Sequence, residues 1–348
     1  MLDRRARPRV SVLLPVRDAA ATLGACLRSV ARQTEPDLEC IVVDDASRDA
    51  SRDVAHRAAR ADARFRVVDG PGRGIAAALE AGLAHCRADV VARMDADDWM
   101  HRDRLRAQCD ALDADASLDG VGCHVRIFPR GALADGRLRY ERWLASLRTP
   151  DDVARDAFVE CPLAHPTWAL RRATFERFPY RDVPFPEDYD LLLRALGAGA
   201  RLGVVPRRLV GWRDGPARLS RTDARYAIAA FTECKAWHLA RGFLAGGDDY
   251  VLWGHGATGR ALARALARHG KHPSAIVELH PRRIGREIAG APVVPPEALG
   301  PGGALEARAR AGALRLVASV AGARPRAEIR AALARLGLRD GADFVCAA

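Results

Sequence analysis

Residues 89–98 read Asp-Val-Val-Ala-Arg-Met-Asp-Ala-Asp-Asp, a short apolar run that leads directly into three acids. A short run rich in valine predicts a buried strand, which here ends at Asp95, Asp97 and Asp98. Because side chains alternate along an extended chain, Asp95 and Asp97 fall on one side of it. Three carboxylates in this place predict either a divalent-cation site or a cap for the next helix.

Three more strands precede this one, and a helical pattern separates each from the next. Apolar runs and apolar spacing predict strands over 9–16, 39–45 and 64–68 and helices over 22–32, 47–61 and 75–86. We expect Ser47 or Asp49 to cap the second helix. Such alternation predicts a parallel sheet with helices on both faces, and ligands of such sheets bind beyond the carboxyl ends of the strands. The acids Asp44 and Asp45 should therefore face the same edge as Asp95–Asp98.

The pattern becomes irregular after residue 120 and regular again at residue 250. We expect a strand over 120–129, a helix over 189–197, a long helix over 224–242 and a linker around 246–249, where glycines and acids interrupt both periodicities. The chain should form an α/β protein with two domains, over 1–222 and 249–348, joined by a helical linker over 223–248.

The second alternation opens with a glycine-rich turn. Gly254-x-Gly256-x-x-Gly259 follows a predicted strand and begins a helix, and Glu278 ends the next strand about 20 residues later. This spacing is that of a Rossmann-like dinucleotide turn, in which a phosphate approaches the helix start. No catalytic set of residues follows it. The domain is therefore either a structural, docking or regulatory module, or one that binds a nucleotide or NAD(P).

The composition narrows the classes of partner. The 348-residue chain has a net charge of +11, and Lys235 and Lys271 are its only lysines. Its arginines alternate with acids and form no basic stripe with stacking aromatics, so we expect no nucleic-acid partner. Codon usage in a GC-rich genome explains the arginine content; attraction to diphosphates or to an anionic membrane face are the functional alternatives.

The chain carries no sign of membrane insertion or secretion. It has no run of about 18 apolar residues and no apolar segment typical of a signal peptide. The 8 cysteines are scattered without a Cys-x-x-Cys pair, so we expect free thiols in a reducing compartment. We therefore expect a cytoplasmic protein, with peripheral association at the inner membrane face left open.

Five segments, in this order along the chain, resemble the family 2 glycosyltransferases of the GT-A fold. They are residues 10–16, 41–49, 72–83, 93–99 followed by Arg104 and Gln108, and 165–167 with 185–194. The resemblance covers about residues 9–220. It implies an inverting, metal-dependent enzyme that transfers a sugar from a nucleotide-diphosphate-sugar donor to a hydroxyl of a glycan or lipid-linked acceptor. A cation, Mn²⁺ or Mg²⁺, would balance the charge of the departing diphosphate.

The resemblance also implies roles for individual residues. Asp97 and Asp95 would bind the metal, with Asp98 behind them or capping a helix. Asp188 would be the catalytic base, with Glu187 as the alternative base; both acids are also suited to capping the helix that follows. Residues implied in substrate binding are Pro15, Asp44, Asp45, Arg73, Asp95, His165 and Arg213.

Two of these assignments have a plain structural alternative. Arg73 is equally suited to be a solvated surface arginine, and His165 to be a hydrogen-bonded structural histidine. The chain also departs from the family pattern. Arg17-Asp18 stands where relatives have an aromatic residue and asparagine, which puts the donor in doubt, and His101-Arg102 replaces a proline. The alternative functions are an NAD(P)-dependent oxidoreductase or bifunctional enzyme and a non-catalytic nucleotide-sugar-binding protein.

Overall fold

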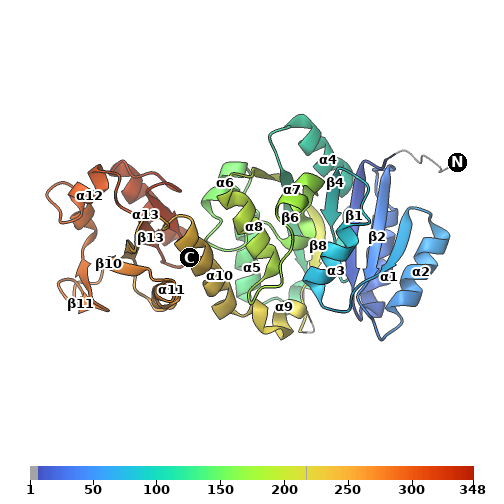
Figure 1. Cartoon of the computed structure of the whole chain (residues 1–348), viewed down its shortest axis with the longest axis horizontal. Helices are drawn as coiled ribbons and strands as arrows, with labels where there is room; N and C mark the ends of the chain where they lie inside the picture. The colour runs from blue at the N-terminus through green and yellow to red at the C-terminus, as the bar shows by residue number, and fades with distance from the viewer. Residues whose placement is uncertain (1–6, 217) are drawn as a thin grey trace. The chain divides into compact units, whose positions relative to one another are not determined.

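The computed structural model describes residues 7–216 and 218–348, which form two compact units (Figure 1). The first unit consists of Met1–Val153, Pro162–Val183 and Asp190–Arg218, and the second of Ala154–Cys161, Pro184–Tyr189 and Leu219–Ala348. The domain limits expected at residues 222 and 249 stay predictions, because compactness alone does not define a domain.

The first unit is built on an eight-stranded mixed sheet with the order β3-β2-β1-β4-β7-β6-β8-β5. Strands β1 to β4 are parallel, as the alternation predicted, whereas β7 runs antiparallel to β4 and β6, and β5 antiparallel to β8. The strands are β1 Val10–Val16, β2 Leu38–Asp44, β3 Phe65–Asp69, β4 Val90–Arg93, β5 Trp99–Met100, β6 Gly120–Phe128, β7 Ala169–Arg171 and β8 Leu202–Arg213.

Helices cover both faces of this sheet. Buried side chains of α1, α2 and α4 pack in one apolar cluster with alternate residues of β1, such as Val12 and Leu14. Helix α3 packs on the other face, where Gly82 lies against Leu13 and Val43. The helices are α1 Ala20–Ala31, α2 Ser51–Ala61, α3 Ile75–Leu83, α4 Arg104–Ala114, α5 Asp135–Leu144, α6 Pro150–Arg155, α7 Arg172–Arg177 and α8 Glu187–Gly197, with short 3-10 turns at Arg130–Ala132 and His165–Thr167.

Two expectations about helix starts are wrong. Helix α2 begins at Ser51, and its N-cap residue is Ala50, without a side-chain cap. Ser47 accepts the backbone N–H of Asp18, and Asp49 accepts those of Ala20 and Ser51, so the Asp49 side chain joins the first residues of α1 and α2 without being the N-cap residue of α2. Helix α8 begins directly after a proline, at Glu187, two residues before the predicted start. The two acids expected to precede this helix therefore lie in its first turn.

The second unit is built on a six-stranded sheet with the order β11-β12-β10-β9-β13-β14. All its strand pairs are parallel except β11 with β12, and helices α11 and α13 pack against opposite faces, which is the expected Rossmann-like arrangement. The strands are β9 Asp249–Trp253, β10 His272–Val277, β11 Glu287–Ile288, β12 Ala291–Val294, β13 Leu316–Ala318 and β14 Phe344–Cys346.

The helix expected over 224–242 is shorter than predicted. Residues Ala224–Tyr226 form a separate 3-10 turn, in which Asp223 accepts the backbone N–H of Arg225, and α10 starts only at Ile228. The helices of this unit are α9 Leu219–Thr222, α10 Ile228–Arg241, α11 Ala257–Ala267, α12 Glu306–Arg310 and α13 Ala323–Arg335, with a 3-10 turn at Pro296–Leu299.

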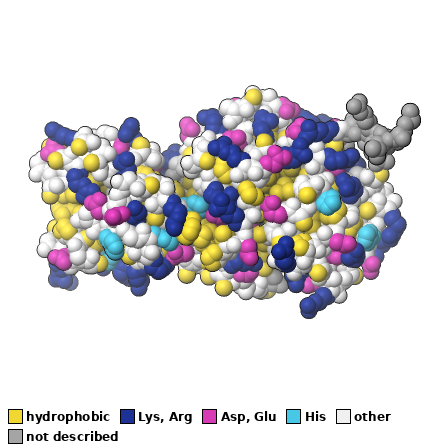
Figure 2. Space-filling view, in the orientation of Figure 1, with side chains coloured by type: hydrophobic (Ala, Val, Ile, Leu, Met, Phe, Trp, Pro, Cys, Tyr) yellow, Lys and Arg dark blue, Asp and Glu magenta, His cyan; other side chains and the backbone are white. Residues whose placement is uncertain are grey.

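Three global features bear on the sequence expectations. All eight cysteines are free and buried, as expected. In the part of the chain that the structure describes, no helix has both the length and the apolar character of a membrane span. On the face that Figure 2 presents, Lys and Arg side chains are interspersed with Asp and Glu.

Candidate functional site

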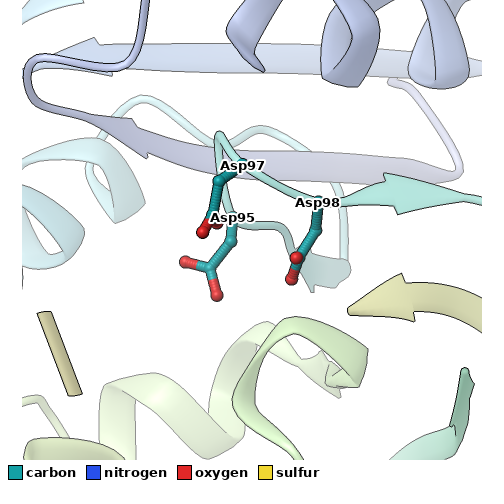
Figure 3. A group of neighbouring side chains, drawn as sticks. All are labelled: Asp95, Asp97 and Asp98. Atoms are coloured by element: carbon teal, nitrogen blue, oxygen red, sulfur yellow. The ribbon is translucent and has the colours of Figure 1, made fainter. Parts of the chain in front are cut away.

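The loop between β4 and β5 gathers three carboxylates. One oxygen each of Asp95, Asp97 and Asp98 lies within 4.8 Å of the others, and in Figure 3 the three side chains extend toward the same side of the loop. Burial, together with the nearby charge of Asp95, raises the pKa of Asp97, and raises that of Asp98 well above its ordinary value. The loop therefore brings three acidic groups close together in a largely buried place.

Asp98 is the most enclosed of the three acids, with 2% of its surface exposed. Its Oδ1 accepts the backbone N–H of Arg213 at 2.6 Å, whereas its buried Oδ2 has no hydrogen-bond partner among the described residues. A buried carboxylate oxygen without a partner needs an explanation. The side chains of Asp95 and Asp97 are 20% and 30% exposed, so they remain accessible. Three hard oxygen ligands fit Mg²⁺ or Mn²⁺.

Three arginines hold this loop. Arg93 is buried and forms an ion pair with Asp95. Arg213 donates from Nε to the backbone oxygen of Asp97 at 2.8 Å, so part of the side chain predicted to bind phosphate is bonded to the acidic loop. The Nε of Arg218 lies 4.0 Å from Oδ2 of Asp97. Arg218 lies in a segment that the family resemblance places near the diphosphate, but it was not itself assigned as a site residue.

A buried polar layer also supports the loop. Arg104 is fully buried, and its Nη2 donates to the backbone oxygens of Arg93 and Trp168 at 2.9 and 3.2 Å. Its Nε donates to Gln108, whose amide in turn donates to the oxygen of Thr167 at 2.7 Å. Both residues were part of the family resemblance without an assigned role. Here they join α4 to the end of β4 and to the His165–Thr167 turn.

The acids after β2 lie at the same sheet edge as this loop, as predicted, since β1 pairs with both β2 and β4 in parallel. Asp45 is buried and accepts the backbone N–H groups of Gly72 and Gly74 at 2.6 and 2.9 Å, so it organises the glycine loop. Asp44 has weaker partners: the Ser47 N–H lies at 3.4 Å and an Arg52 nitrogen at 3.6 Å. Asp44 is as buried as Asp45, but its carboxylate has more hydrogen-bonding capacity left for a ligand.

The other predicted substrate residues differ in their surroundings. Pro15 is partly exposed near the end of β1, and Arg73 is exposed without a hydrogen bond or ion pair to a described residue. His165 is buried, its Nε2 is 2.7 Å from the Tyr180 hydroxyl, and its ring packs edge-on against Trp168. Burial and the charge of Arg93 lower the pKa of His165 well below its ordinary value, so the ring is neutral at pH 7.

Glu187 and Asp188 belong to the second unit. The Glu187 carboxylate is buried and accepts a hydrogen bond from the Tyr226 hydroxyl at 2.6 Å, a partner 39 residues away that local patterns do not reveal. Asp188 is less buried, and its Oδ1 accepts the backbone N–H of Tyr189 at 2.7 Å. Of the two acids in the first turn of α8, Asp188 is therefore the more accessible.

The glycine-rich turn of the second unit follows β9, as predicted. Gly256 is the N-cap residue of α11, and Gly254 and Gly259 flank it. Glu278 follows β10, and its Oε2 accepts a hydrogen bond from Arg283 at 2.9 Å.

The comparison with protein families identifies a region that lies mostly in the first unit. Residues 11–178 match the family described as "Glycosyl transferase family 2". This region belongs to glycosyl transferase family 2. The family resemblance and the expectation of a glycosyltransferase are thus confirmed for the part of the chain that contains the acidic loop.

Individual relatives agree with this family. EpsH of Bacillus subtilis (strain 168), which carries a provisional glycosyltransferase assignment, is 36% identical over 110 residues, or 30% of this chain and 32% of EpsH. EpsJ, an uncharacterized glycosyltransferase of the same strain, is 26% identical over 64% of this chain and 65% of its own. The chain thus spans about a third of one relative and just under two thirds of the other.

A solved structure shows the same fold. Residues 1–349 of S. aureus TarS, in complex with UDP-GlcNAc, align with a TM-score of 0.56 at 17% identity, over 75% of this chain and 72% of that one. At this identity the likeness establishes the glycosyltransferase fold alone.

Proposed function

We propose that this glycosyltransferase transfers a sugar from a nucleotide-diphosphate-sugar to a hydroxyl of a glycan or lipid-linked acceptor, with inversion at the anomeric carbon. The observation that carries the proposal is the acidic loop, where three carboxylates meet and Oδ2 of Asp98 lacks a hydrogen-bond partner among the described residues. Asp95, Asp97 and Asp98 would hold Mn²⁺ or Mg²⁺. A bound cation would stabilise the negative charge of the leaving diphosphate.

The donor would bind at the carboxyl ends of β1, β2 and β4. Asp44 would accept hydrogen bonds from the base or ribose, while Asp45 keeps the glycine loop in place through its two backbone bonds. Arg73, exposed in that loop, would add positive charge toward the diphosphate. The TarS complex with UDP-GlcNAc, a protein of the same fold, supports a nucleotide-sugar as the class of donor.

Asp188 is proposed as the base that removes the acceptor proton. A carboxylate within hydrogen-bond reach of a hydroxyl can take its proton as the oxygen attacks the anomeric carbon. The hydrogen bond from Tyr226 occupies Glu187, which makes it the weaker candidate. Attack by the acceptor in a single step inverts the anomeric centre and leaves no glycosyl-enzyme intermediate.

Donor binding and the chemical step can be tested separately. A panel of UDP- and GDP-sugars is titrated into the protein with Mn²⁺, and slow hydrolysis of the bound donor is followed. Asp97→Ala should abolish cation-dependent binding. Asp188→Asn should bind the donor normally but lose about 10²–10⁴-fold in transfer, the usual contribution of a general base. Glu187→Gln, which still accepts the Tyr226 hydroxyl, is the matched control.

Two outcomes would contradict the proposal. Unchanged transfer by Asp188→Asn would remove the base assignment. Absence of cation-dependent binding for every nucleotide-sugar in the panel would remove the donor assignment.

A further inference from the structure

In the second unit the order in which the chain adds strands to the sheet reverses beside β9. Strand β9 pairs with β10 on one side and β13 on the other. Helix α11 carries the chain from β9 toward β10, whereas α13 carries it from β13 to β14, in the opposite direction. In open α/β sheets, ligands bind beyond the carboxyl ends of the strands at this point. The glycine-rich turn after β9 lies there.

The three glycines of this turn differ in what they contact. Gly254 has a φ of +91°, and a Cβ on it would lie 2.4 Å from Cγ2 of Val320, so the loops after β9 and β13 touch here. A Cβ on Gly259 would lie 2.0 Å from the oxygen of Gly254. Gly256 has an ordinary φ of −73°, and its Cβ would meet nothing within 4 Å. Close packing explains why glycine is needed at positions 254 and 259, but not at position 256. The open space at Gly256 leaves the start of α11 accessible to a ligand.

A buried hydroxyl lies beside the same turn. Ser319 is 2% exposed, its backbone N–H donates to Trp253 at 2.9 Å, and its Oγ has no hydrogen-bond partner within the described residues. Val317, two residues earlier, packs with Leu262 of α11, so alternation directs the Ser319 side chain to the face that α11 covers. Buried hydroxyls almost always have a partner. This one is placed to donate to a ligand at the start of α11.

Two arginines lie beside the turn. Arg260 and Arg283 both donate to the backbone oxygen of His255, at 3.4 and 3.2 Å. Helix α11 has no acid in its first turn, so its N–H groups and the guanidinium of Arg260 favour an anion, whereas Glu278 balances the charge of Arg283. Glu278, at the position that accepts the ribose hydroxyls in NAD-binding domains, is already paired with Arg283.

We propose that the turn Gly254–Gly259, the first turn of α11 and the Ser319 hydroxyl bind the diphosphate of a nucleoside diphosphate. The N–H groups of α11 and Ser319 Oγ donate to phosphate oxygens, and Gly256 allows the phosphates to approach the backbone. The pairing of Glu278 with Arg283 disfavours NAD, because ribose hydroxyls would compete with this guanidinium and the Leu279 N–H for the carboxylate. This site is distinct from the acidic loop of the glycosyltransferase domain and needs no metal.

The test uses calorimetric titration of the full chain in EDTA, which suppresses cation-dependent binding at the acidic loop. The probes are UDP, GDP, NADH, NADPH and inorganic pyrophosphate. UDP or GDP should bind saturably. Gly256→Asp should weaken this binding by more than about tenfold, because the new carboxylate occupies the N–H groups of α11 and repels phosphate. The variant should fold, because the side chain enters open space and aspartate is a favourable N-cap residue.

Two further variants separate the site from general effects. Ala227→Asp places the same charge at the N-cap of α10 in the same unit and should bind the nucleotide like the wild type. Ser319→Ala should weaken nucleotide binding about fivefold or more without lowering the melting temperature, since its Oγ has no bond to lose in the free protein.

Each contrary result overturns a defined part of the proposal. Failure of UDP and GDP to bind at millimolar concentration, or equal binding by Gly256→Asp and Ala227→Asp, would refute the site. Tighter binding of NADH or NADPH than of either nucleoside diphosphate would refute the choice of ligand. Wild-type affinity in Ser319→Ala would refute the part assigned to the hydroxyl.

Discussion

Oδ1 of Asp98 accepts the backbone N–H of Arg213 at 2.6 Å, a bond that joins residues 115 positions apart in the sequence. It connects the acidic loop to the last residue of β8. The second oxygen, Oδ2, is buried and lacks a hydrogen-bond partner among the described residues. Asp98 therefore has one oxygen that stabilises the fold and one that is available to a cation, and substitutions can separate the two.

Replacing Asp98 by asparagine should separate stability from cation binding. The amide oxygen of Asp98→Asn can still accept the Arg213 N–H, and the loss of charge relieves repulsion from Asp95 and Asp97. Stability in EDTA should stay equal or rise, while Mn²⁺ affinity falls at least about tenfold, since carboxylates are the preferred ligands. Asp98→Ala also loses the acceptor and should be less stable by about 1–3 kcal/mol.

Urea denaturation measures the change in stability, and Mn²⁺ titration measures the change in affinity. Equal Mn²⁺ affinity in wild type and Asp98→Asn would exclude Oδ2 of Asp98 as a ligand.

The two acids after β2 should respond differently to the same change. Asp45→Asn can offer only one oxygen to the N–H groups of Gly72 and Gly74, so stability should fall by about 1–3 kcal/mol. Asp44→Asn loses only long contacts and should change stability by less than about 1 kcal/mol. Its effect should appear in the affinity for UDP or GDP in the presence of Mn²⁺. The assignment of Asp44 to the donor fails if nucleotide affinity is unchanged in Asp44→Asn.

The parts of the site that sequence could predict are those governed by local pattern. An apolar run followed by acids identified the ends of β2 and β4, and strand–helix alternation placed both at one sheet edge. The glycine turn after β9 was visible for the same reason. A strand was expected near residues 169–171, but the antiparallel direction of β7 and the edge strand β5 were not predictable, because they depend on pairing between distant segments.

The residues that support the acidic loop and α8 could not be predicted from local sequence patterns. The bond between Asp98 and Arg213, the Tyr226 partner of Glu187, and the buried position of Arg104 all depend on tertiary contacts. The family resemblance indicated the segment that begins at Arg218, but its approach to Asp97 is visible only in the folded chain. The start of α2 was misplaced because Ser47 bonds to the loop after β1, while Asp49 accepts the backbone N–H groups of Ala20 and Ser51, the first residues of α1 and α2.

Close packing of α3 on the sheet makes Gly82 sensitive to substitution. A Cβ there would lie 2.4 Å from Leu13 and 2.6 Å from Val43, so Gly82→Ala should destabilise the protein by about 1–3 kcal/mol through overpacking. Gly197, the last residue of α8, has nothing within 4 Å of its Cβ position, and Gly197→Ala should be neutral or gain up to about 1 kcal/mol. Thermal unfolding compares the pair; equal melting temperatures would show that the core around Leu13 relaxes freely.

Because of Lys235, the stability of the folded protein should change with pH in the alkaline range. Its Nζ donates to the backbone oxygens of Val159 and Ala347 at 2.7 and 3.1 Å, and burial lowers its pKa from 10.5 to about 8. Between these two values the unfolded chain keeps a proton that the folded chain has released. The free energy of unfolding contributed by this residue therefore rises with pH across that window, and the cost of burying the charge is fully present below it.

The measurement is the difference in urea midpoint between wild type and Lys235→Met, taken at several pH values from 7 to 10.5. The difference removes the titration of the buried thiols and of every other group common to both proteins. It should shift in favour of the wild type as the pH rises, because only the wild type gains stability from releasing this proton. A difference that stays constant or shifts toward Lys235→Met would mean that the folded protein keeps Lys235 charged. In that case the two backbone oxygens, rather than deprotonation, would compensate for its burial.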